Sequence, residues 1–367
     1  MPSITVVPLT PGLMSLTDYK SDDESDALSD FSLSVASSVT SYDASMRSAS
    51  PAPSNYSVTS SIRAQSYRHE YGRGLNNYSE VYRLPADDEE FERLDKQHHM
   101  FKFIMGKYPP PLPEVLKDDI PGETKACLDL GCGSGSWILE CARDFPHCQA
   151  VAVDLVPMQA TNIPPNCRSE VDDINLGMQH FYGDFNVVHA RLISSGIRDY
   201  HGLIEQVVQV LRPGGLVDFL EFDFRCYDEN HRPIFSKPGV MEGPWLPRWM
   251  SLLNMAVRQR GGSPDASNML YAWFMQNPAY EDIVYREIWL PTAAIYPPGH
   301  PDYWIGKVMG EDIQAFLKSG RPLLLGSGLQ ESLVDELQQR AHTEVEEARI
   351  VTFCRVESVY ARKRVQL

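Results

Sequence analysis

One stretch of the chain, CLDLGCGSGSWILECARDFP at residues 127–146, limits the possible folds more than any other. An apolar run ends at Leu130, and Gly131, Gly133 and Gly135 follow before a helical pattern begins. Glycine lets the backbone turn tightly and approach a ligand that side chains would keep away, beside the N-terminus of a helix. The stretch therefore predicts a strand, a ligand-binding loop and a helix in succession.

Strands and helices alternate through the rest of the chain. Further strands are expected at these ranges: 150–154, 185–190, 216–222, 283–290 and 349–360. Helices are expected at 201–211, 247–259, 303–317 and 330–347. Such alternation favours a Rossmann-like α/β fold, in which helices cover both faces of a mostly parallel sheet.

Two carboxylates and one serine narrow the class of ligand. Asp154 ends the second expected strand, 23 positions beyond Gly131, where a carboxylate can accept hydrogen bonds from ribose hydroxyls. Asp129 precedes the loop, where it would repel a pyrophosphate but attract the ammonium group of an amino acid. Ser136 stands where a dinucleotide fingerprint needs its third glycine, so a nicotinamide oxidoreductase is disfavoured.

Five motifs carry a resemblance to a known family: LDLGCGSG, VAVDLVP, VDDI, FNVVHARLI and VLRPGGLVDFLEF. In this order they resemble the motifs of class I S-adenosylmethionine-dependent methyltransferases, most closely a fungal secondary-metabolism family that includes TAM-domain and global-regulator-like members. The preceding YRLPADDEEFERLDKQHH is similar to that family's N-terminal signature. The resemblance covers residues 78–223 well and the last third more loosely, and it implies a seven-stranded sheet.

The resemblance also implies which residues hold S-adenosylmethionine. The positions that match are Asp129, Gly131, Gly133, Gly135, Asp154, Leu155, Asp173, Ile174 and His189. The glycines would approach the methionine moiety and Asp154 the ribose. Leu155 would cover one face of the adenine, Asp173 would accept from its amino group, and the amide of Ile174 would lie near the ring.

Methyl transfer from a sulfonium is an in-line displacement, so alignment of the acceptor is the main task of the enzyme. An oxygen acceptor of high pKa would need a general base, for which His98 and His189 are the candidates, with His99 and His180 as further choices. A carboxylate acceptor would need none. His98 also follows the apolar stripe of its helix and His189 could be a packing residue, so structural roles remain open for both.

Three segments organise the chain. Residues 1–71 are rich in Ser, Asp and Pro and are expected to form a disordered tail, because they cannot bury enough apolar surface. Residues 72–120 are expected to be a helical extension or lid, with order beginning near Tyr78 and a helix capped by Asp87 or Asp88. Residues 121–367 would be the methyltransferase domain, with an aromatic insertion at 226–280 that, with the helix at 90–103, would meet the acceptor.

Charge and composition limit the partners. A formal net charge of −16 argues against direct binding to nucleic acid. No run approaches the roughly 18 apolar residues that span a bilayer, and no secretory signal is recognisable, so an intracellular location in the cytoplasm or nucleus is expected. The 7 cysteines include no CxxC pair, which favours free thiols and no metal site.

Two roles fit these observations. A small-molecule methyl acceptor, a secondary metabolite, is the favoured partner. The alternative is a methyltransferase-like nuclear regulator of secondary metabolism that acts in a complex with a protein partner. A binder that keeps the fold without turnover is disfavoured, because the positions that would hold the cofactor are intact.

Overall fold

The computed structural model describes residues 4–6, 64–160, 162–237 and 240–365. Most of the expected tail at 1–71 therefore lies outside the described residues. Within it, a short strand β1 (Ile4–Val6) pairs with the sheet edge, and a hairpin of β2 (Tyr67–Glu70) and β3 (Arg73–Asn76) precedes Tyr78. Structure thus begins earlier than the sequence analysis expected.

The turn of this hairpin explains why the sequence did not reveal it. Tyr71 and Gly72 join the two strands, and both have positive φ, 52° and 79°. Two such residues make the type I′ turn that suits a two-residue hairpin, but Asn or Asp is the usual first residue, not Tyr. Arg73 then binds Asp87 at 2.7 Å, and Arg83 binds Glu70 at 2.7 Å, which ties the hairpin to the chain that follows.

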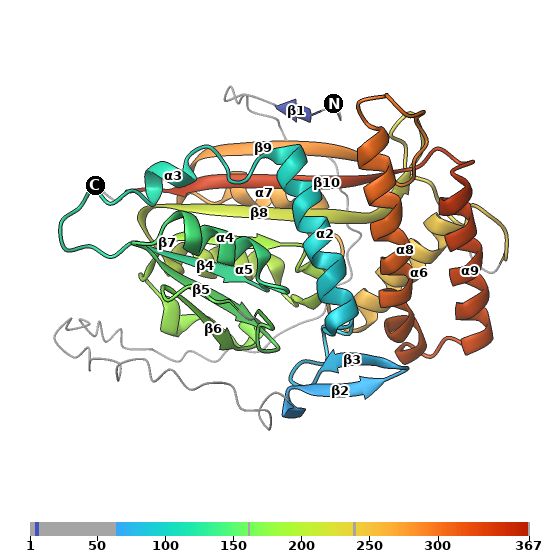
Figure 1. The fold of residues 1–367 in the computed structure, drawn as a ribbon, viewed down its shortest axis with the longest axis horizontal. Helices are drawn as coiled ribbons and strands as arrows, with labels where there is room; N and C mark the ends of the chain where they lie inside the picture. The colour runs from blue at the N-terminus through green and yellow to red at the C-terminus, as the bar shows by residue number, and fades with distance from the viewer. Residues whose placement is uncertain (1–3, 7–63, 161, 238–239, 366–367) are drawn as a thin grey trace, which may run out of the picture. The chain divides into compact units, whose positions relative to one another are not determined.

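The main sheet has the order β1-β9-β10-β8-β7-β4-β5-β6 (Figure 1). Its strands after β1 are β4 (Ala126–Leu130), β5 (Gln149–Asp154), β6 (Cys167–Val171), β7 (Phe185–Arg191), β8 (Leu211–Tyr227), β9 (Tyr280–Pro291) and β10 (Phe353–Lys363). Strands β4 to β8 pair in parallel, whereas β10 runs antiparallel between β8 and β9. The expected seven-stranded, mostly parallel sheet is confirmed, with β1 added at its edge.

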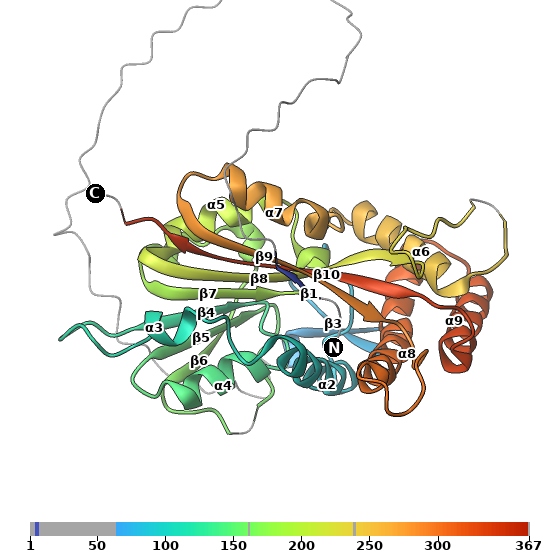
Figure 2. The same cartoon turned by 90° about the horizontal axis from the view of Figure 1, so that it is seen from above.

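Helices cover both faces of the sheet, as expected. The helices α3 (Leu112–Val115) and α4 (Ser136–Asp144) pack on one face, and α5 (Tyr200–Val210) and α7 (Ala266–Gln276) pack on the other (Figure 2). The strands between them bury both of their faces, which is the usual setting of parallel sheets. No helix among the described residues is long and apolar enough to cross a membrane.

A second group of helices lies beyond the parallel strands. It consists of α2 (Asp88–Met105), α6 (Trp245–Gln259), α8 (Tyr303–Gly326) and α9 (Glu331–Glu347), which share a core with the long ends of β8, β9 and β10. Asp87 caps α2 by accepting from the backbone N–H of Glu90, as the sequence predicts. The insertion between β8 and β9 contributes α6 to this group and α7 to the sheet face.

Candidate active site

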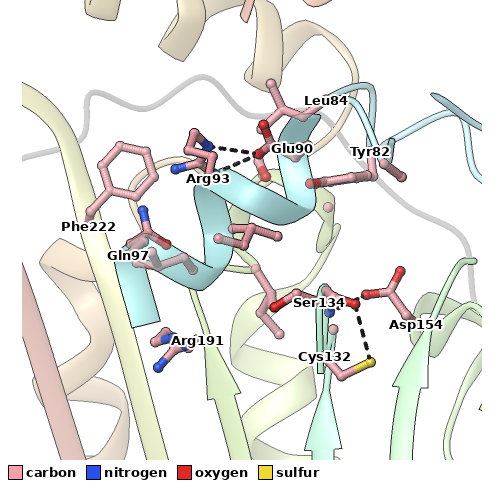
Figure 3. Close-up of a pocket in the computed structure, with 18 of the residues that line it drawn as sticks. Tyr82, Leu84, Glu90, Arg93, Gln97, Cys132, Ser134, Asp154, Arg191 and Phe222 are labelled. Carbon is pink, nitrogen blue, oxygen red and sulfur yellow. Dashed lines mark hydrogen bonds and ion pairs between the residues drawn. The ribbon is translucent and has the colours of Figure 1, made fainter. Parts of the chain in front are cut away.

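The strand order places a crevice between β4 and β7. The chain continues from β4 toward β5 on one side and from β7 toward β8 on the other, so the order reverses there. In open α/β sheets, ligands bind at such a point, beyond the carboxyl ends of the strands. A cavity of about 180 Å³ lies at this position, between the glycine loop and helix α2 (Figure 3).

Two of the three loop glycines line the cavity. Gly131 and Gly133 have φ of 67° and 56°, and a Cβ at Gly133 would lie 2.8 Å from Leu94 Cδ1 of α2. The absence of a side chain therefore lets α2 close over the loop. Gly135, with φ of 81°, does not line the cavity; a Cβ there would overlap Met158 Sδ. The resemblance implied that Gly135 approaches the methionine moiety of the cofactor. In the structure it packs against the side chain of Met158 instead.

Asp154 connects the loop to the end of β5. Its Oδ2 accepts from the backbone N–H of Gly133 at 2.8 Å, and its carboxyl group lines the cavity beside the loop. Burial raises its pKa to about 6. Cys132 also lines the cavity, and burial raises the pKa of its thiol well above the ordinary value, so this side chain fills space as a neutral group.

The residues expected around the adenine meet at one end of the cavity. Leu155, Asp173 and Ile174 all line it, from the loops after β5 and β6. Asp173 also caps the short 3₁₀ helix at Ile174–Leu176, where its Oδ1 accepts from the backbone and the side chain of Asn175 at 3.1 and 2.8 Å. This cap fixes the loop that would face the ring.

Asp129 and His189 form a buried pair at the carboxyl ends of β4 and β7. The two residues lie opposite each other in the sheet, and His189 Nδ1 is 2.8 Å from Asp129 Oδ1. The imidazole stacks on Trp137 of α4, with ring centroids 3.9 Å apart and planes at 4°. Both residues line the cavity, so the structure brings together an acid and a histidine whose ring is held on two sides.

His98 lies elsewhere. It lines a smaller neighbouring cavity of about 50 Å³, and its Nδ1 is 3.2 Å from Arg191 Nη1. Because a guanidinium only donates, this nitrogen must be the unprotonated acceptor. Burial and the charge of Arg191 lower the pKa of His98 to about 4. His98 is therefore a neutral partner of Arg191, which does not suit the general-base role considered for it.

A buried ionic network that sequence reasoning missed lines the opposite wall. Arg93 Nη2 binds Glu90 Oε1 at 2.6 Å within α2 (Figure 3). Arg93 Nη1 binds Asp312 Oδ1 of α8 at 2.8 Å. Gln97 donates to Asp312 Oδ2 at 3.2 Å. All four side chains line the cavity. Polar residues on the apolar face of a helix are a weak indication of a buried network. No sequence pattern predicts that α2 and α8 are in contact.

Apolar side chains complete this half of the cavity. They come from β8, α6 and α8: Phe222, Leu246, Met250, Met309, Ile313 and Phe316. The tryptophans of the insertion have other places, since Trp249 is fully buried in the core and Trp273 stacks near Tyr200. The tryptophans of the insertion therefore do not line the cavity, although the sequence analysis expected the insertion to meet the acceptor.

The donor set of the cavity fits S-adenosylmethionine. Asp154 offers a carboxylate for hydroxyl groups, and Leu155 and Ile174 offer apolar walls for a flat ring. The backbone of Gly131 and Gly133 is open to the cavity without side chains, and Asp129 places a carboxylate near where an ammonium group would lie. When bound, the cofactor supplies the methyl group.

The chain is similar to known methyltransferases and to a regulator of secondary metabolism. Residues 97–269 match the family model described as a methyltransferase domain. The chain is 48% identical over 300 residues to the secondary metabolism regulator laeA of Coprinopsis cinerea, covering 81% of this chain and 74% of that protein. It is 26% identical over 214 residues to the methyltransferase str2 of Strobilurus tenacellus, covering 58% and 72%. A phosphoethanolamine N-methyltransferase 2 of Haemonchus contortus aligns with a TM-score of 0.40 at 16% identity, over 74% of this chain and 57% of that one.

Fold and site define a class I S-adenosylmethionine-dependent methyltransferase. Its cofactor is S-adenosylmethionine. Within this class, the chain belongs to the fungal family that includes the secondary metabolism regulator laeA of Coprinopsis cinerea.

Proposed function

We propose that this methyltransferase acts on a small, largely apolar acceptor held between α2, α6 and α8. The observation that supports this most strongly is the continuity of the cavity, whose lining runs from the glycine loop to the apolar side chains of α6 and α8. A methyl group bound beside Gly131 would face that apolar half. Alignment of acceptor and methyl group is what such a site contributes to an in-line displacement.

The cofactor half of the cavity is assigned residue by residue in this proposal. Gly131 and Gly133 lie along the methionine moiety, Asp129 faces its ammonium group, and Asp154 accepts from the ribose hydroxyls. At the other end, Leu155 and Ile174 enclose the adenine and Asp173 faces its amino group. Gly135 shapes the loop through Met158 without touching the cofactor.

His189 is the proposed general base where the acceptor is an oxygen of high pKa. Asp129 orients the ring through Nδ1, and Trp137 holds its plane, so the remaining nitrogen is fixed in position. This arrangement of a histidine oriented by a carboxylate is the common form of a positioned base. His98 is assigned to Arg191 instead.

A second role is supported by one specific comparison. At 48% identity, the secondary metabolism regulator laeA is far more similar to this chain than the methyltransferase str2 is at 26%. We therefore propose as the alternative that the chain regulates secondary metabolism together with a protein partner. Residues 121–367 would then carry the catalytic fold and 72–120 a lid, to which β2 of the segment 1–71 is paired through β3.

Labelled methyl transfer tests the first role. The purified protein is incubated with methyl-labelled S-adenosylmethionine and a small-molecule extract of its source organism. The wild-type protein should label a small molecule, and Met250→Trp, which fills the apolar half, should not, while its affinity for S-adenosylhomocysteine stays the same. Label that appears only in protein would count against a small-molecule acceptor.

A deletion strain tests the second role. It is complemented with the wild-type gene or with Asp154→Ala, and metabolite profiles are compared together with proteins recovered by pull-down. Loss of many unrelated metabolites, with a recovered partner, supports a regulatory role. Loss of a single methylated product supports the small-molecule role.

A further inference from the structure

Arg191 occupies a special place in the site. It is the last residue of β7, and it lines both the main cavity and the smaller one beside it (Figure 3). Leu192, which follows it, has a φ of 58°, a conformation that non-glycine residues rarely adopt. Such outliers gather at functional sites, where the surrounding structure compensates for their cost.

Among the described residues, no carboxylate forms an ion pair with the guanidinium of Arg191. Its Nη1 donates to His98 Nδ1 at 3.2 Å, and its Cζ lies 5.8 Å from the centre of the Phe101 ring. Within the part of the chain that the structure describes, it forms no ion pair, and its Nε and Nη2 have no hydrogen-bond partner. Arg93, on the opposite wall of the same cavity, binds two carboxylates.

Two of the three acids around Arg191 are engaged with other groups. Asp129 binds His189 at 2.8 Å, and Glu140 binds Lys102 at 2.6 Å. The third, Asp218, lines the smaller cavity together with Arg191, but it lies opposite His189 in the sheet, whereas Arg191 lies opposite Leu220. Burial lowers the pKa of Arg191. The negative charges of these three carboxylates raise it, but by less than burial lowers it. A desolvated cation without a direct counter-charge is costly, and a ligand that supplies one would remove much of this cost.

The free edge of this guanidinium has the shape that a carboxylate requires. Nε and Nη2 form one side of the planar group, and two parallel N–H groups on one side can bind both oxygens of a carboxylate. The same edge does so elsewhere in this protein, where Arg73 Nε and Nη2 bind the two oxygens of Asp87 at 2.7 and 2.8 Å. In Arg191, His98 occupies Nη1 and leaves that edge open.

We propose that Arg191 binds a carboxylate of a ligand in the main cavity through its Nε and Nη2. This inference rests on the proposed function, since it assumes that the cavity holds cofactor and acceptor. Two sources can supply the group: the methionine carboxylate of the cofactor, or a carboxylate on the acceptor. His98, whose Nε2 lies 3.3 Å from Glu140 Oε2, is then a positioning residue that fixes the rotation of the guanidinium.

The first arm of the test compares S-adenosylmethionine with decarboxylated S-adenosylmethionine, which keeps the sulfonium and ammonium groups. Their affinities are measured by calorimetry for the wild-type protein, Arg191→Met and Arg191→Lys. If the cofactor supplies the carboxylate, the wild type prefers S-adenosylmethionine by at least about ten-fold, Arg191→Met loses this preference, and Arg191→Lys keeps part of it. Arg349→Met, an exposed arginine paired with Glu347, serves as the control and should behave as wild type.

The second arm titrates benzoate, a simple apolar carboxylate, into protein saturated with S-adenosylhomocysteine. If the acceptor supplies the carboxylate, benzoate binds the wild type and its affinity falls at least about ten-fold in Arg191→Met, while benzamide does not bind. Either arm supports the proposal and names the source. The proposal is overturned if Arg191→Met, folded by its thermal transition, changes neither the preference for the carboxylated cofactor nor the binding of benzoate.

This outcome is distinct from a failure of the proposed function. If the wild-type protein does not bind S-adenosylhomocysteine at all, the assignment of the cavity is wrong and not merely that of Arg191. If it binds S-adenosylhomocysteine and Asp154→Asn weakens that binding, while Arg191→Met leaves both arms unchanged, only the carboxylate site is removed from the account.

Discussion

The two halves of the cavity are built in different ways. The proposed cofactor half comes from loops that directly follow β4, β5, β6 and β7, and hydrogen bonds between neighbouring loops hold it, such as the one from the backbone N–H of Gly133 to the carboxylate of Asp154. The proposed acceptor half comes from α2, α6 and α8, and a buried ionic network joins α2 to α8 across more than two hundred residues. The first half therefore comes from one continuous stretch of the chain, from β4 to the loop after β7, whereas the second brings together helices that lie far apart in the sequence.

This contrast indicates where specificity can change. Backbone geometry fixes the cofactor half, so few substitutions there keep the loop intact. In the acceptor half, side chains of helices determine the shape, and they can vary while the helices stay in place. Relatives with a common cofactor could in this way serve different acceptors.

The largest effect is expected from the ionic network. Arg93→Met leaves Glu90 and Asp312 buried without their cation and should lower the free energy of unfolding by about 3–5 kcal/mol in urea denaturation. Arg321→Met is the matched control on α8, because the carboxylates that Arg321 binds, Glu331 and Asp335, are exposed, and it should cost less than about 1 kcal/mol. Equal losses for the two variants would show that the network does not hold the acceptor half together.

The next effect concerns the cofactor half alone. In the proposed site, Asp154→Asn removes the charged acceptor for the ribose hydroxyls and should weaken S-adenosylhomocysteine binding by about 1.5–3 kcal/mol, at least about ten-fold, in calorimetry. Asp265→Asn, at an exposed ion pair with Arg258, should leave the affinity as it is. An unchanged affinity in Asp154→Asn would place the ribose elsewhere.

Gly135 separates loop shape from ligand contact. Gly135→Ala places a Cβ at a position with φ of 81° and against Met158. It should therefore lower the free energy of unfolding by roughly 1–3 kcal/mol in thermal denaturation. The folded fraction should still bind S-adenosylhomocysteine within about two-fold of the wild type, since Gly135 does not line the cavity. If Gly135→Ala has normal stability but binds S-adenosylhomocysteine much more weakly, Gly135 contacts the cofactor, as the sequence motif implies.

The smallest effect is a dependence on pH. Because burial raises the pKa of Asp154 to about 6, the carboxyl group is ionised at pH 7 and mostly protonated at pH 5. Only the ionised form accepts from both ribose hydroxyls, so the affinity for S-adenosylhomocysteine should fall about ten-fold from pH 7 to pH 5. Asp154→Asn should abolish this dependence. If the affinity of the variant still falls between pH 7 and pH 5, another titrating group is responsible.

The sequence predicts what is local and regular. The strand at Ala126–Leu130 and the helix that starts after Gly135 lie where the pattern places them, because apolar burial and turn chemistry decide both. Strand β6, at Cys167–Val171, was missed, since its residues are only partly buried and show no apolar pattern. Helix α8 runs through Pro322 to Gly326, past the expected end at residue 317, because packing outweighs the local preference.

The site divides in the same way. Asp154 and His189 line the cavity as the motifs imply, since strand ends fix both. Gly135 and His98 do not line this cavity. Gly135 packs against Met158 and His98 binds Arg191, and no local sequence pattern predicts either contact. The role of Asp312 could not be predicted, since its partner lies 219 residues away.

A crystal structure with S-adenosylhomocysteine tests the central claim most directly. The account predicts the ribose hydroxyls at Asp154, the adenine between Leu155 and Ile174, and the sulfur facing the half of the cavity formed by α2, α6 and α8. Density for the ligand in the smaller cavity beside His98, or a sulfur that faces away from α8, would contradict it.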